Sequence, residues 1–204
     1  MFASRFSLCS GLALLPILAS AQESPSDSLP FHQHQWAAQF GGGTSFAGLG
    51  FLRFTAPRRA WLLDFHFTGG HSHDYQYAND TLTGQGLTSN ATVDARIGRR
   101  FYQSRGRSIE SFQTVGALGG FAHSCLEVTP PTVGSCANGW TAGVFGEVGA
   151  AYLITRRFSI GGAATMAFSY QRTTVKAPGA GVIDRRWSYQ GSLQGLSFAA
   201  TVYF

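Results

Sequence analysis

The stretch LSFAATVYF, Leu196–Phe204, alternates apolar residues with smaller or more polar ones up to its last position. One face of the stretch is entirely apolar, with Leu196, Phe198, Ala200, Val202 and Phe204. A period of two residues is the period of a β-strand. A strand that is apolar on one side promotes aggregation unless both of its edges are paired. We therefore expect this strand to close a β-barrel by pairing with a first strand near Trp36.

The first 21 residues have the layout of a cleaved secretory signal. One cation, Arg5, precedes the apolar run LALLPILAS and a small-residue ending at 19–21. The run is too short to cross a bilayer as a helix, and Cys9 precedes it, which argues against a lipoprotein anchor. We predict a signal peptide at 1–21, a periplasmic segment at 22–35 and one barrel domain at 36–204.

The composition favours a strand protein that faces lipid. Only 12% of the residues are charged, whereas soluble domains carry about 25%. No later segment is apolar over the 18 residues that a membrane helix requires. The net charge of +5 comes from arginines scattered along the chain, so we expect no nucleic acid partner.

Alternating segments recur along the chain, and we expect strands at 36–43, 46–55, 61–69, 89–102, 108–122, 139–154, 157–171 and 187–204. Their one-sided apolar bands suit tilted transmembrane strands whose apolar face meets lipid. The facing direction within 46–55 and 108–122 stays open, because aromatic residues occupy both parities there. Polar residues on the opposite faces are predicted to form a lumen cluster of Asp64, His66, Asp94, Arg96 and Glu147. A barrel of this size is filled by side chains. We therefore expect these charged groups to form ion pairs or to be hydrated, and we expect no open pore.

The expected connections alternate between short and long. Short basic turns at 56–60, 103–108 and 155–157 are assigned to the periplasmic side. Long connections at 70–88, 123–138 and 172–186 are assigned to the extracellular side. The first connection, GGGTSFAG, is the exception, because it should be extracellular and is nearly a tight turn.

The signal sequence, the alternating strands and the final QGLSFAATVYF resemble the small eight-stranded outer-membrane β-barrel proteins of Gram-negative bacteria. The resemblance implies an all-β, closed, antiparallel, up-and-down transmembrane barrel, monomeric in the bacterial outer membrane. Its implied partners are outer-membrane lipids, lipopolysaccharide and the barrel-assembly machinery, which reads the terminal strand during insertion. The family implies no single activity.

Two kinds of candidate site occur in the expected loops. Cys125 and Cys136 lie on one connection, and in an oxidising compartment we expect them to form a disulfide rather than a metal site. His71 and His73, with Asp74 beside them, have the spacing of a chelating pair. His32 and His34 have it as well, but two histidines without a third ligand seldom hold a metal, and we predict neither metal nor cofactor.

The predicted function is a non-enzymatic structural or surface-interaction role through the extracellular loops 70–88, 123–138 and 172–186. The first alternative is an enzyme that modifies lipid A, for which His123, Ser124 and Glu127 are the candidates. Neighbouring strand residues point to opposite faces, so this pair departs from the His-x-Ser pattern of lipid A deacylases. The second alternative is a soluble exported binding barrel, which requires the aromatic side chains of Trp61, Phe65, Phe158 and Phe168 to point inward.

Overall fold

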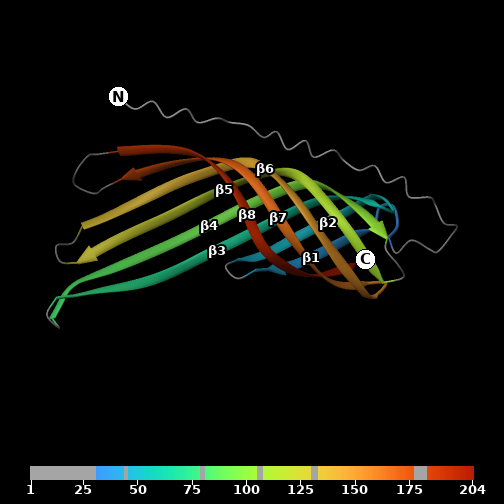
Figure 1. Ribbon diagram of the computed structural model, residues 1–204, viewed down its shortest axis with the longest axis horizontal. Helices are drawn as coiled ribbons and strands as arrows, with labels where there is room; N and C mark the ends of the chain where they lie inside the picture. The colour runs from blue at the N-terminus through green and yellow to red at the C-terminus, as the bar shows by residue number, and fades with distance from the viewer. Residues whose placement is uncertain (1–30, 44–45, 79–80, 105–107, 130–132, 177–182) are drawn as a thin grey trace, which may run out of the picture.

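The computed structural model describes residues 31–43, 46–78, 81–104, 108–129, 133–176 and 183–204. The predicted signal peptide lies outside these ranges. Eight antiparallel strands pair in chain order and form a closed barrel (Figure 1). They are β1 (Trp36–Gly42), β2 (Ala47–Ala56), β3 (Arg59–Ala78), β4 (Thr81–Ser104), β5 (Ile109–Thr129), β6 (Val133–Thr155), β7 (Phe158–Lys176) and β8 (Ile183–Tyr203). Among the described residues, no helix is long and apolar enough to cross a membrane.

The terminal strand closes the barrel, as its alternation predicts. β8 pairs with β1 from Ala37 opposite Tyr203 to Gly42 opposite Phe198. The Phe204 amide donates to the Trp36 carbonyl at 2.9 Å, which extends the seam by one position. Leu196, Phe198 and Phe204, from the predicted insertion signal, are exposed on the outer face.

The side chains sort by parity into an apolar outside and a polar inside. Trp61 and Phe168 are 46% and 56% exposed, whereas Asp64 on the alternate face of β3 is buried. The soluble-barrel alternative needs these aromatic side chains inside, and it is therefore wrong. The structure also resolves the open parities, because Phe51 and Val115 face outward while Leu52 and Phe112 are buried.

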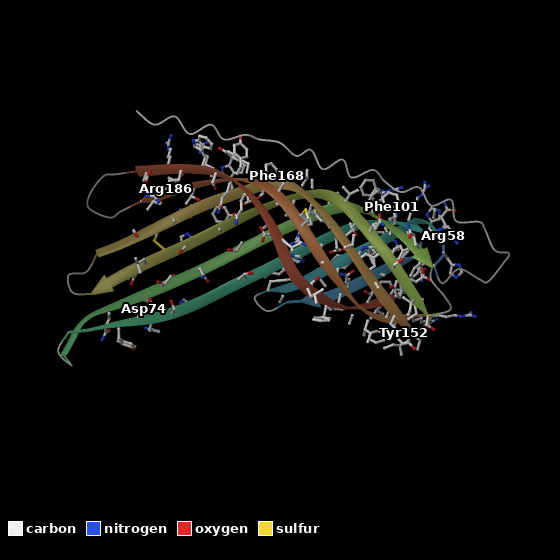
Figure 2. The ribbon with its side chains drawn as sticks, viewed as in Figure 1. Arg58, Asp74, Phe101, Tyr152, Phe168 and Arg186 are labelled. Atoms are coloured by element: carbon white, nitrogen blue, oxygen red, sulfur yellow. A yellow bond between two sulfur atoms is a disulfide. The ribbon has the colours of Figure 1, made fainter. Side chains whose placement is uncertain are left out.

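The two ends of the barrel differ in character. Figure 2 shows Arg58, Phe101 and Tyr152 gathered at the end that holds the short turns, and Asp74 and Arg186 toward the opposite end. At the short-turn end, the guanidinium of Arg99 lies 4.8 Å from the ring centroid of Trp61. This pairing of tryptophan and cation suits a membrane interface.

The long connections predicted at 70–88, 123–138 and 172–186 are mostly strand, which corrects the sequence-based assignment. The ladders continue through His71 opposite Ser89, and through Ser124 opposite Ala137. In Figure 1 these strands run on past the short β1–β2 hairpin. Alternation of hydrophobicity disappears where neither face of a sheet meets lipid, although the backbone ladder continues. Sequence periodicity therefore detects only the lipid-facing part of each strand.

β8 also contains a register shift that the alternation of the sequence did not reveal. Gln194 pairs with Thr165 and Leu196 pairs with Ala164, so one extra residue is inserted in β8. An inserted residue changes the facing parity of the strand. Leu193 and Leu196 consequently both face outward and are strongly exposed.

Candidate functional site

Aromatic side chains seal the short-turn end of the lumen. The buried set comprises Phe31, Phe54, Tyr102, Phe112 and Tyr203. The Phe31 ring centroid lies 4.6 Å from that of Phe54 and 4.8 Å from that of Tyr102. Phe31 belongs to the segment before β1, which was predicted to be periplasmic, and it enters the end of the barrel.

A local turn directs Phe31 into the lumen. His34 has a φ of 68°, in the left-handed region that reverses the chain locally. Its amide donates to the Phe54 carbonyl at 2.8 Å, and the Phe54 amide donates to the Gln35 carbonyl at 2.9 Å. These bonds attach the segment to β2, so the aromatic seal is anchored to the barrel wall.

A buried ion pair forms the next layer of the lumen. Arg100 Nη2 donates to Glu147 Oε1 at 2.7 Å, and both side chains are almost fully buried. Arg100 also donates to Gln39 at 2.9 Å and to Thr114 at 3.0 Å. The guanidinium lies 4.2 Å from the ring centroid of Phe112. Only about 30 Å³ of free space remains at this level, so the layer blocks the lumen.

Beyond this layer the lumen opens into a cavity of about 270 Å³. All five polar residues that the sequence places in the lumen line this cavity: Asp64, His66, Asp94, Arg96 and Glu147. His66 Nε2 lies 2.7 Å from Asp64 Oδ2, and its ring packs on Phe46 with 4.5 Å between centroids. Gly120 makes room for Asp94, because a Cβ at Gly120 would overlap the Asp94 carboxylate.

Glu147 is the one member of the layer around Arg100 that the sequence analysis placed in the lumen, and the other members were not predicted. Arg100 and Tyr102 have the same parity as Asp94 and Arg96 on β4, so the alternation could have identified them as inward. Gln39 and Thr114 carry no charge and lie on other strands, so no sequence signal connects them with Glu147. Phe31 precedes every alternating segment and had no periodic signal either.

The predicted disulfide is present on the outer face of the barrel. Cys125 and Cys136 are bonded to each other at directly opposed positions of β5 and β6. His123 lies beside them, with Nε2 3.3 Å from Cys125 Sγ and Nδ1 2.7 Å from Asn138 Oδ1. In the described part of the chain, His123 and the two cysteines are the only three metal-ligating residues grouped closely enough to share an ion. Both sulfur atoms are already bonded to each other.

The other candidate side chains stay apart. Parity places His71 and His73 on the outer face of β3 and Asp74 on its inner face. His32 and His34 are exposed beside the barrel end. His123 and Ser124 lie on opposite faces of β5, and Glu127 is exposed on the face of His123. The residues proposed for lipid A chemistry therefore do not converge.

The comparisons identify the fold. No family model and no curated protein matches the sequence. A major outer membrane protein from Thermus thermophilus is similar with a TM-score of 0.56 and 14% identity, over 83% of this chain and 98% of that chain. Acinetobacter baumannii CarO2 and CarO give TM-scores of 0.46 and 0.42, with 9% and 12% identity, over 85% and 84% of this chain and 100% and 97% of theirs. At these identities the likeness establishes the fold alone, which is that of outer-membrane β-barrels.

Proposed function

Taking the chain to be an outer-membrane β-barrel protein, we propose that it acts without catalysis by holding anionic glycolipid of the outer leaflet against its extracellular sheet. The extracellular sheet is the described part of 70–88, 123–138 and 172–186. The observation that carries the proposal is a basic patch on β7 and β8. It lies on the outer face, directly beyond a group of aromatic side chains.

The basic patch consists of Arg172, Lys176 and Arg185, all exposed. Arg172 stands opposite Trp187 in the ladder, and Arg185 stands opposite Thr174, one same-face position further out. Diagonal neighbours of this kind lie about 7–8 Å apart. Two arginine side chains that start from strand positions at that separation can hold one phosphate between them through charge-assisted hydrogen bonds.

The aromatic group below the patch marks the membrane interface. The ring centroids of Tyr170 and Tyr189 are 5.4 Å apart, and those of Trp140 and Tyr170 are 5.3 Å apart. Tyr and Trp side chains settle at headgroup level. Cations placed immediately beyond them reach the phosphates of an anionic leaflet, where each contributes about 1 kcal/mol.

Two further features support a binding role over a catalytic or conducting one. The separation of His123 from Ser124 on β5 supports a role without acyl chemistry. The layer around Arg100 and the aromatic seal both obstruct the lumen, which supports a role without conduction. The Cys125–Cys136 disulfide joins two strands of the extracellular sheet and makes it a rigid platform.

The test replaces Arg172, Lys176 and Arg185 together with Gln and measures the affinity of the folded barrel for purified lipopolysaccharide. We expect binding to weaken at least tenfold, because three cations at about 1 kcal/mol each are removed. The control replaces Arg156 and Arg157, which form the exposed turn between β6 and β7 at the opposite end. Equal affinity of the triple variant and the wild type would refute the proposal.

A further inference from the structure

The paired part of the β1–β2 hairpin, seven pairs from Trp36 with Arg53 to Gly42 with Ala47, is too short to cross the apolar layer of a membrane. β1 has 7 residues, whereas a tilted transmembrane strand needs about 9–11. At about 3.3 Å per residue and a tilt of about 40°, β1 covers about 18 Å of an apolar band about 25 Å tall. The last described pair of the hairpin, Gly42 with Ala47, therefore lies inside the outer-leaflet half of the apolar layer.

The strands on either side of this hairpin continue, and the wall consequently has a notch. The last pair between β2 and β3 is Ala47 with Phe67, and the last pair between β1 and β8 is Gly42 with Phe198. Beyond these pairs, within the described ranges, β3 is bonded only to β4, and β8 only to β7. We call the gap between these two edges, beyond the level of Gly42 and Ala47, the lateral notch.

The lateral notch opens toward lipid. Leu196 lies just beyond Phe198 on the outer face of β8, and Leu193 follows it at 75% exposure. Strand edges at this depth present backbone N–H and C=O groups, which are costly to leave unsatisfied in hydrocarbon. A bound molecule with an apolar part and a polar part can contact the apolar side chains and also satisfy the backbone groups of the strand edges.

The cavity of about 270 Å³ lies directly behind the notch, with Phe46, Thr68, Leu196 and Phe198 in its lining. It is blind, because the layer around Arg100 blocks the lumen below it. Its lining and the pair beneath contain three carboxylates (Asp64, Asp94, Glu147) and two guanidinium groups (Arg96, Arg100). The site therefore has one excess negative charge when His66 is neutral.

An apolar groove continues from the notch along the outside of the barrel. It is lined by Phe40, Ile160 and Gly162 among others, and it shares Phe198 and Ala199 with the cavity. A Cβ added at Gly162 would lie 3.7 Å from the Phe198 ring, so the absence of a side chain there keeps the groove open. The apolar groove and the acidic cavity thus meet at Phe198.

We propose that the lateral notch is a binding site for a single-chain amphiphile with a small ammonium head. The head enters the cavity beside Asp94, and the alkyl chain passes over Phe198 into the external groove. The size of the cavity limits the head to a small group, and its charge favours a cation. The chain as a whole is positive, at +5, so nonspecific attraction favours anionic amphiphiles instead.

The test titrates the folded barrel in a neutral detergent with dodecylammonium, dodecanol and dodecyl sulfate, and counts bound molecules by native mass spectrometry. We expect one dodecylammonium per barrel, bound at least tenfold more tightly than either of the other two. Asp94→Asn should weaken dodecylammonium binding about tenfold, since a charged hydrogen-bond partner is removed. Preferential binding of dodecyl sulfate or dodecanol would overturn the proposal.

A lipid-facing variant and its control test whether the alkyl chain leaves the cavity through the lateral notch, and neither alters the interior of the barrel. Gly162→Trp fills the groove and should also weaken dodecylammonium binding about tenfold. Gly146→Trp is the control, because Gly146 is outward on β6 and nothing lies within 4 Å of an added Cβ. A change in electrophoretic mobility on heating verifies that each variant forms a folded barrel. If Gly162→Trp bound dodecylammonium as well as Gly146→Trp does, the chain would not lie in the groove and the lateral route would be wrong.

Discussion

Removing the Glu147 carboxylate is expected to destabilise the barrel strongly, because it leaves a buried cation without its partner. Glu147 accepts hydrogen bonds from Arg100 at 2.7 Å and from Thr114 at 3.1 Å, and the Arg100 and Glu147 side chains are 3% and 8% exposed. Breaking one side of a buried pair costs about 3–5 kcal/mol. Glu147→Ala should therefore lower the free energy of unfolding by about that amount, and Glu147→Gln, which keeps an acceptor, by about 1.5–3 kcal/mol.

The matched control is an exposed pair of the same length. Arg186 and Asp184 are also 2.7 Å apart, but their side chains are 77% and 47% exposed. Exposed pairs contribute about 0–1 kcal/mol, so Asp184→Ala should have little effect. The double variant Arg100→Met with Glu147→Leu should lie within about 2 kcal/mol of the wild type, because it leaves neither member of this pair as an unpartnered buried charge.

The assay is reversible urea unfolding of the barrel in phospholipid vesicles, followed by tryptophan fluorescence and by gel mobility. A buried, directly bonded pair should give a coupling free energy of at least about 3 kcal/mol between Arg100 and Glu147 in the double-mutant cycle. If Glu147→Ala destabilised the barrel no more than Asp184→Ala, the pair would be screened by water. The lumen at Arg100 would then not be packed as described.

Three further results are expected. Deletion of Phe204 should reduce the folded fraction severalfold in gel-mobility assays of assembly, because its amide and carbonyl both bond to Trp36 at the seam; normal assembly would contradict this. Phe31→Ala should lower the free energy of unfolding in urea by about 3–5 kcal/mol, the usual loss for a buried aromatic side chain, and an unchanged midpoint would show that the aromatic seal is not packed. Replacing Cys125 and Cys136 by Ser should remove about 3 kcal/mol of stability and speed proteolysis of the extracellular sheet, while unchanged proteolysis would contradict a role in rigidity.

The sequence predicted the lipid-facing half of the barrel because lipid imposes one rule on every strand. Residues such as Leu63, Val144 and Phe168 must face outward wherever the strand is in the membrane. Beyond the membrane both faces of β3–β8 meet water, so the alternation no longer reports strand structure. The bulge in β8 could not be detected for a related reason. Leu193 and Leu196 have opposite parity in the sequence, and either one alone is compatible with an unbroken strand.

The interior was predicted less completely, because its contacts join strands that are distant in the sequence. Parity alone directs Asp64, Arg96 and Glu147 inward, but it does not pair them. Arg100 reaches Gln39, 61 positions away, across a lumen whose contacts depend on the register of several strands at once. A residue that precedes the first strand, such as Phe31, is constrained by no strand period at all.

The one irregularity in the sequence pattern has the largest structural consequence. The connection GGGTSFAG is short where the other extracellular connections are long, and β1 and β2 end with it while β3 and β8 continue. In a barrel every strand closes the wall for both neighbours, so one short hairpin leaves two edges unpaired at the same height. Asp64 and His66 lie below this opening, opposite Gly50 and Gly48 of β2, and their side chains stay almost buried. The lateral opening therefore follows from the length of β1–β2, because the last pairs that this hairpin makes are Gly42 with Phe198 and Ala47 with Phe67.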